Sequence, residues 1–201
     1  PVVLPEDDLL NDIKALTRCS PTFKKDWEEA KQQGYMLKYE RTGFNSWTCP
    51  GSKTINISRA TYGWSSAKDR RSVVAHEVAH AANAPKMRHH DRKFMTRSSF
   101  ALQNTREYIK DEGNSVLREF EVANEMKENC PEETYELMKA RQRDPSYQDV
   151  LNKPGQSRDQ RCEGMGRIDA AKRPSGQPPG TTYQTKFMTH FLRAPRPHGR
   201  P

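Results

Sequence analysis

The residues of this chain best suited to chemistry are His76, Glu77 and His80, within the run VVAHEVAHAAN. A spacing of four places the two histidines on one face of a helix, about one turn of 5.4 Å apart, so both imidazoles can reach one metal ion. The Glu77 carboxylate follows the first histidine and can reach a water molecule on that ion. Imidazole suits zinc, which in catalytic sites keeps one position open for water. We therefore expect His76 and His80 to bind Zn²⁺.

Glu77 has the chemistry of a general base in this arrangement. A zinc ion lowers the pKa of its water from 15.7 to about 7. A neighbouring carboxylate can then take the proton of that water and later give it to a leaving amine. The pattern predicts metal-assisted hydrolysis, with Glu77 as the catalytic residue.

The surroundings of this motif favour the metal interpretation. The helix is apolar on all sides, which is typical of a buried helix; its flanking residues are Val73, Val74, Ala75, Val78, Ala79, Ala81 and Ala82. Ser66 and Asp69 form a predicted capping box, and Pro85 closes the far end. Buried His and Glu are costly without partners. The alternative is two core histidines that backbone carbonyls satisfy.

A catalytic zinc needs a third protein ligand. Glu112 and Glu119 share the buried face of a predicted helix, DEGNSVLREFEVANEM, so both can reach a metal. His90, in the polar run MRHHDRK, is the rival. Without a metal, Glu112 would be a charge that offsets the helix dipole, and Glu119 would belong to a buried ion pair.

These motifs resemble the zincin metallopeptidases over roughly residues 50–125. VVAHEVAHAAN resembles their active-site helix, and TINIS resembles the edge strand that pairs with an extended peptide substrate. The glutamate zincins (gluzincins) place a small residue three positions after their third ligand, as Glu112 and Ser115 do. DEGNSVLREFEVANEM also resembles the E-G-x-[AS] helix of bacterial toxin and effector metallopeptidases. The resemblance implies a zinc endopeptidase with Glu112 as the third ligand.

Two alternatives stay open. HHDRKF resembles the third-ligand segment of SprT-like proteases, which act on DNA-bound proteins, with His90 or, in a shifted register, His89 as the ligand. The order of preference is Glu112, His90 and then Glu119. The other alternative is a non-catalytic binding module with a structural zinc, whose four positions protein ligands would close. Oxyanion-stabilising tyrosines are available, but none is assigned: Tyr62, Tyr108 and Tyr183.

The elements around the motif predict an α+β fold, mostly helical and zincin-like, with a small antiparallel sheet and an irregular C-terminal tail. Residues 7–19 carry a helical stripe of Leu9, Leu10, Ile13 and Leu16. Residues 20–34 predict a second helix, with Ser20 as N-cap, Pro21 first and Gly34 at the end. YMLKYE and TINIS alternate as strands do. Helices are also expected at 91–109, 111–126 and 131–143.

Charge and composition separate a body from a tail. Of the net charge of +8, residues 153–201 supply ten Lys/Arg against three acids, and they also hold seven of the 14 prolines. We expect a metallopeptidase domain at 1–152 and a basic Pro/Gly-rich segment at 153–201 that packs partly on it. A near-neutral body argues against specific nucleic-acid binding. No apolar run reaches the roughly 20 residues of a membrane span.

The remaining expectations concern cellular context. The chain begins at Pro1 and carries no recognisable signal peptide, so we expect a piece of a longer protein. The resemblance implies a delivered toxin, similar to metallopeptidase domains at the C-termini of type VI secretion spike proteins, that acts in the periplasm of a target bacterium. Its partners would be a protein or peptide substrate and an immunity protein. Cysteines 19, 49, 130 and 162 permit two disulfides or unpaired buried thiols.

Overall fold

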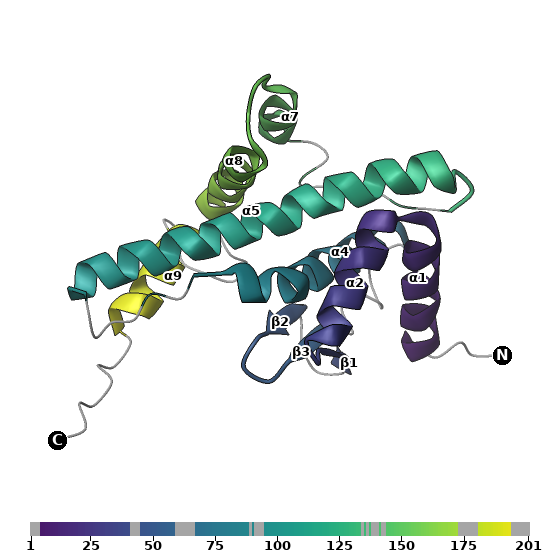
Figure 1. Ribbon diagram of the computed structural model, residues 1–201, viewed down its shortest axis with the longest axis horizontal. Helices are drawn as coiled ribbons and strands as arrows, with labels where there is room; N and C mark the ends of the chain where they lie inside the picture. Colours follow the sequence, from purple (N-terminus) through teal and green to yellow (C-terminus); the bar gives the residue numbers. More distant parts are fainter. Residues whose placement is uncertain are drawn as a thin grey trace.

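The computed structural model describes residues 5–40, 45–58, 67–88, 90, 95–133, 135, 137, 141, 144–172 and 181–193. Within these residues the chain forms seven α-helices, one 3₁₀ helix and a three-stranded sheet (Figure 1). The elements in chain order are α1 (Pro5–Cys19), α2 (Pro21–Gln32), β1 (Met36–Glu40), β2 (Trp47–Cys49), β3 (Thr54–Ser58), α4 (Ala67–Asn83), η1 (Ala84–Lys86), α5 (Arg97–Asn129), α7 (Pro145–Asn152), α8 (Arg158–Ala171) and α9 (Tyr183–Arg193). The α+β class and its mostly helical character are as predicted.

The first two helices follow the sequence signals closely. The Ser20 hydroxyl accepts a hydrogen bond from the Phe23 N–H at 3.0 Å, and Pro21 opens α2. Gly34 follows α2 with a φ of +83°, a conformation that glycine adopts without strain. The predicted stripe of α1 differs at one position: Leu10 is exposed, whereas Leu9 is buried.

The sheet is mixed, not antiparallel as predicted. Its order is β1-β3-β2, with β1 parallel and β2 antiparallel to β3. The short strand β2 lies between the two predicted strands and was not predicted. Because β2 pairs with β3, the TINIS strand is central and fully buried, and the prediction that it forms the edge was wrong. Strands β1 and β2 are the two edges instead.

Helix α4 lies in the middle of the molecule, between the sheet and α5 (Figure 1). Its apolar residues Val74, Val78 and Ala81 are fully buried in the main core. Pro85 falls in η1 directly after α4, as predicted. The predicted capping box falls outside what the structure describes: Ser66 is not among the described residues, and the side chain of Asp69 is not described.

Helix α5 is one continuous helix of 33 residues, where the sequence indicated two shorter ones. It begins at the Thr96 cap, whose hydroxyl accepts a hydrogen bond from the Ser99 N–H at 3.2 Å. Residues 91–94, where the sequence predicted this helix to begin, lie outside the described residues. The further helix predicted from Pro131 does not begin there, because residues 131–133 form a turn and a bend.

The C-terminal segment carries helices where an irregular tail was predicted. A capping box of Ser157 and Gln160 begins α8, and Met165 on this helix is fully buried. Helix α8 crosses α5 at two glycines: a Cβ on Gly113 would lie 1.7 Å from the Cys162 carbonyl oxygen, and one on Gly166 would lie 1.8 Å from that of Ile109. The helix was missed because such glycines interrupt its apolar pattern.

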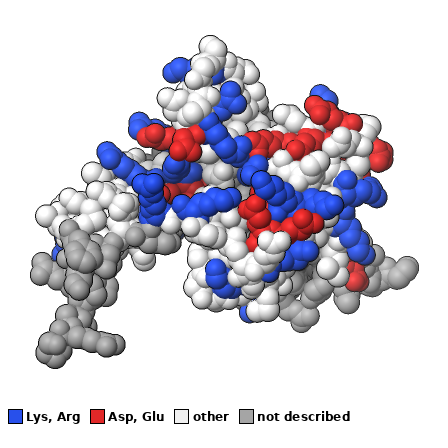
Figure 2. Space-filling model, in the orientation of Figure 1, with Lys and Arg blue, Asp and Glu red and all other residues white. Residues whose placement is uncertain are grey.

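One disulfide is present among the described cysteines, between Cys19 and Cys130. Cys49 and Cys162 are free thiols. None of the helices in the described part of the chain combines the length and the apolar character that crossing a bilayer requires. On the face shown in Figure 2, basic and acidic side chains are interleaved. Among the described residues, Lys110 and Asp159 form an ion pair of 2.8 Å.

Candidate metal centre

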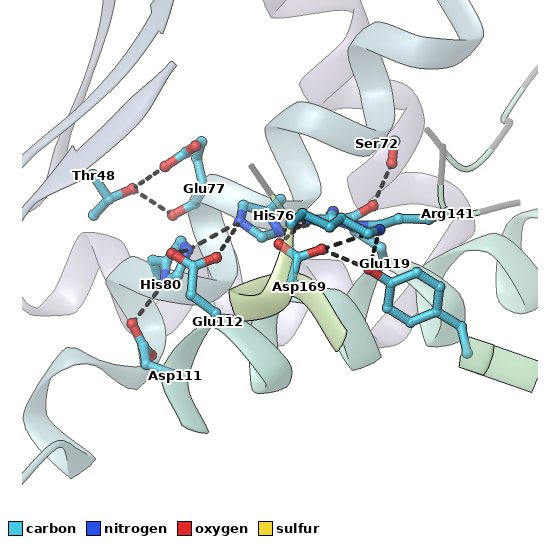
Figure 3. Close-up of polar contacts among 12 residues, drawn as sticks. Thr48, Ser72, His76, Glu77, His80, Asp111, Glu112, Glu119, Arg141 and Asp169 are labelled. Atoms are coloured by element: carbon cyan, nitrogen blue, oxygen red, sulfur yellow. Dashed lines mark hydrogen bonds and ion pairs between the residues drawn. The ribbon is translucent and has the colours of Figure 1, made fainter. Parts of the chain in front are cut away.

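Helices α4 and α5 bring His76, His80 and Glu112 together (Figure 3). The Nε2 atoms of the two imidazoles are 3.0 Å apart. Glu112 Oε2 lies 3.5 Å from Nε2 of His76, and its Oε1 lies 3.7 Å from Nε2 of His80. Each residue therefore offers one ligand atom to a shared point, and the three form a candidate metal-binding group.

The spacing and charge of this group fit a divalent cation. Four ligands at about 2.0–2.1 Å around a tetrahedral ion are spaced about 3.3–3.4 Å apart. The two Nε2 atoms are 3.0 Å apart, and the two Glu112 oxygens lie 3.5 and 3.7 Å from the Nε2 atom that each faces, which is close to that spacing. Four carboxylates and one guanidinium surround the two rings: Glu77, Asp111, Glu112, Glu119 and Arg141. A cation would offset this negative surplus.

Each imidazole has a carboxylate behind it. His76 Nδ1 lies 2.7 Å from Glu119 Oε1, and His80 Nδ1 lies 2.6 Å from Asp111 Oδ2. A carboxylate only accepts, so each Nδ1 donates its hydrogen and each Nε2 is left to face the shared point. This is how metal-binding histidines are usually oriented in proteins.

The acidic neighbours shift the pKa values of both histidines. Burial and Arg141 oppose a charged His76, but hydrogen bonds to Glu112 and Glu119 outweigh them and raise its pKa to about 10. Burial also opposes a charged His80, and Asp111 and Glu112 raise its pKa to about 9. In the chain alone, both imidazole rings therefore favour the protonated, positively charged form. A metal ion would compete with protons for the same nitrogens.

Glu77 lies beside the group without belonging to it. The Thr48 hydroxyl on strand β2 is 2.9 Å from Glu77 Oε2 and 2.8 Å from the Glu77 carbonyl oxygen, which anchors the residue to the sheet. Burial raises the pKa of Glu77, while His76 and His80 oppose that rise. A carboxylate held here can take a proton from a water molecule next to the group.

The other predicted candidates take different places. Glu119 reaches His76 from the Nδ1 side, so it lies behind the ring and outside the group. Among the described residues, no group of three metal-ligating side chains includes His90; its backbone N–H donates to Asn104 Oδ1 at 3.3 Å. Tyr108 packs against Phe187 and Phe191 of α9. Not described are His89, Tyr62 and the side chain of Tyr183.

Four residues of the site were not predicted from the sequence: Thr48, Asp111, Arg141 and Asp169. Asp111 had a detectable signal, because it precedes Glu112 on the same helix. Arg141 had none, since an arginine 22 residues beyond Glu119 reaches it only through tertiary structure. Thr48 had none either, because its strand is three residues long.

No known protein-family model matches this chain, and neither curated proteins nor solved structures include a significant match to it.

Proposed function

We propose that this protein is a zinc-dependent endopeptidase, in which His76, His80 and Glu112 hold the metal and Glu77 is the catalytic base. The observation that carries the proposal is the convergence of two Nε2 atoms and one carboxylate within 3.0–3.7 Å, next to a separate buried carboxylate. Two imidazoles and a carboxylate are a donor set of catalytic zinc sites, which leave a fourth position open.

The residues of the chain divide the work of hydrolysis. Zinc bound at this group would lower the pKa of water and polarise a peptide carbonyl. Glu77 takes the proton of the attacking water and returns it to the leaving amine. Thr48 holds the Glu77 carboxylate at 2.9 Å and so fixes its direction. His76 and His80, each backed by a carboxylate, keep their Nε2 atoms aimed at one point.

The position of Glu112 favours this function over a SprT-like protease. The alternative needs His90 as the third ligand, and that residue is held through its backbone by Asn104 on α5. Glu112 is the carboxylate that approaches both Nε2 atoms.

The test uses the purified chain, zinc analysis and a proteome-derived peptide library read by mass spectrometry. Glu77→Gln should keep zinc and lower cleavage by about 10²–10⁴-fold, because it removes the general base alone. His76→Ala should lose zinc itself. Glu128→Gln, an exposed carboxylate elsewhere on α5, is the matched control and should cleave normally. Full cleavage by Glu77→Gln would contradict the mechanism, and absence of zinc from the wild-type chain would contradict the metal centre.

For the biological role we propose a delivered bacterial toxin that acts in the periplasm of a target cell. Two observations support it: the resemblance of residues 111–126 to effector metallopeptidases, and the Cys19–Cys130 disulfide, a bond that persists in oxidising compartments. Export of the chain into a bacterial periplasm should slow growth, whereas export of Glu77→Gln should not. Equal growth at equal protein levels would contradict the role. An immunity protein would be found as a partner that restores growth.

A further inference from the structure

Glu119 is a fully buried carboxylate behind the candidate metal centre. Its Oε1 faces His76 Nδ1 at 2.7 Å and also accepts a hydrogen bond from Arg141. Its Oε2 accepts a hydrogen bond from the Ser72 hydroxyl at 2.7 Å. A buried carboxylate is costly without a counter-charge. Because His76 must be neutral to bind a metal, the positive charge that balances Glu119 comes from Arg141.

Arg141 is itself buried and has a second acidic partner. Its Nη2 donates to Asp169 Oδ2 at 3.1 Å, while its Nη1 lies 3.3 Å from His76 Nδ1. Asp169 Oδ1 accepts a hydrogen bond from the Tyr147 hydroxyl at 2.6 Å. The guanidinium thus bridges two carboxylates, one on α5 and one on α8 (Figure 3). A planar fork with several N–H donors suits that task better than an ammonium group.

The crossing of α5 and α8 brings Asp169 to this position. At Gly113 and Gly166 the helices touch backbone to backbone, and Gly113 follows the candidate ligand Glu112 directly. Asp169 lies one helical turn beyond Gly166, so the same contact that fixes α8 on α5 delivers its carboxylate to Arg141.

We propose that Arg141 is a positioning residue for the metal centre, which ties helix α8 to His76 through Asp169 and Glu119. This inference rests on the proposed zinc site. Arg141 lies on the Nδ1 side of His76 and is not one of the proposed ligands; it fixes the Glu119 carboxylate against Nδ1 and thereby the direction of the His76 ring. Losses of such outer partners typically weaken metal binding by about 10–100-fold.

The test measures Zn²⁺ affinity by chelator competition, and the visible spectrum of the Co²⁺-substituted protein. Arg141→Met should lower Zn²⁺ affinity by about 10–100-fold and alter the Co²⁺ bands. Arg141→Lys, which keeps the charge and loses the fork, should fall between Met and wild type. Asp169→Asn should lower affinity by less than Arg141→Met, because Glu119 keeps its partner.

Arg118→Met is the matched control. Arg118 directly precedes Glu119 on α5, but it is partly exposed and forms its ion pair with the buried Asp26 of α2, at 3.0 Å. It should lower thermal stability without moving Zn²⁺ affinity or the Co²⁺ spectrum, which is the behaviour of a merely structural arginine.

The outcomes separate this inference from the proposed function. A wild-type chain that binds no Zn²⁺ overturns the metal centre and this inference with it. A wild-type chain that binds Zn²⁺, with a folded Arg141→Met protein of equal affinity and spectrum, overturns the positioning role alone. Should Arg141→Met fail to fold, Asp169→Asn decides: lower affinity supports the role, and unchanged affinity and spectrum overturn it.

Discussion

His76 and His80 lie on one face of α4, yet the carboxylates behind them differ in burial and in reach. Asp111, behind His80, is held locally: Asn83 on α4 donates to its Oδ1 at 2.6 Å. Glu119, behind His76, is fully buried and connects through Arg141 to Asp169 on α8. One ring is thus supported by the two helices that carry the candidate metal-binding group, and the other by the C-terminal part of the fold. Supports with such different reach should respond differently to mutation.

The largest effect on stability is expected from a substitution that forces α8 away from α5. A methyl group in Gly113→Ala would meet the Cys162 carbonyl oxygen at 1.7 Å, which is backbone and cannot turn away. We expect the free energy of unfolding to fall by more than about 3 kcal/mol, measured by urea denaturation. Gly51→Ala is the control, because nothing lies within 4 Å of the added methyl and φ is not positive there. Equal stability of the two variants would contradict the close crossing.

The direct comparison of the two supports is Glu119→Gln against Asp111→Asn. Both keep shape and remove charge, but Glu119→Gln also deprives buried Arg141 of a partner. We expect Zn²⁺ affinity to fall about 100-fold for Glu119→Gln and about 10-fold for Asp111→Asn. Isothermal titration with Zn²⁺ measures both. A larger loss in Asp111→Asn would reverse the ranking of the supports.

Acid should weaken the longer support. Burial raises the pKa of Asp169, but Arg141 and the Tyr147 hydrogen bond outweigh it and hold that pKa at about 2. A folded pKa below the unfolded value of about 3.9 gives stability that is present above pH 4 and lost as the pH falls toward 2. The stability advantage of wild type over Asp169→Asn should therefore shrink by about 2 kcal/mol between pH 5 and pH 2. A constant advantage in metal-free protein would contradict the ion pair.

The smallest effects on stability are expected from the residues that hydrogen-bond to the two supporting carboxylates. Ser72→Ala removes the hydroxyl that donates to buried Glu119 Oε2 at 2.7 Å, and should lower the free energy of unfolding by about 1–2 kcal/mol. Asn83→Ala removes the donor to Asp111 in a more exposed place and should cost about 0.5–1 kcal/mol. Thermal denaturation of both variants checks the order. An Asn83→Ala protein less stable than Ser72→Ala would contradict it.

The sequence was most informative where the chemistry is local. His76, Glu77 and His80 sit on a helix that is apolar on all sides, so the local sequence alone predicts that they are buried. Periodicity also put Glu112 and Glu119 on one face of α5, but it could not separate a carboxylate in front of the rings from one behind them. That difference depends on where α4 crosses α5, which is a tertiary property. Whether Glu112 binds metal stays a prediction.

Longer-range features left weaker signals. Strand β2 is three residues long and gives no alternating pattern. Without it, the two longer strands were predicted to be antiparallel neighbours, whereas β1 and β3 are parallel. In α8, Gly164 and Gly166 occupy positions where an apolar side chain would have indicated a helix, because the helix meets other parts of the chain so closely there. Proline and glycine around it then predicted a loop. The ion pair between Arg141 and Asp169 depends on that helix, so it was not predicted either.

The Cys19–Cys130 bond determines which parts of the chain stay covalently linked after a single proteolytic cleavage. It closes a covalent ring of chain that contains the two histidines, Glu77 and Glu112, and it leaves Arg141 and Asp169 outside. The turn between α7 and α8 is exposed at residues 153–155. A single cleavage in that turn would leave α8 attached to the ring by non-covalent contacts alone. Mild denaturant should then release it, while every proposed ligand stays within one closed loop.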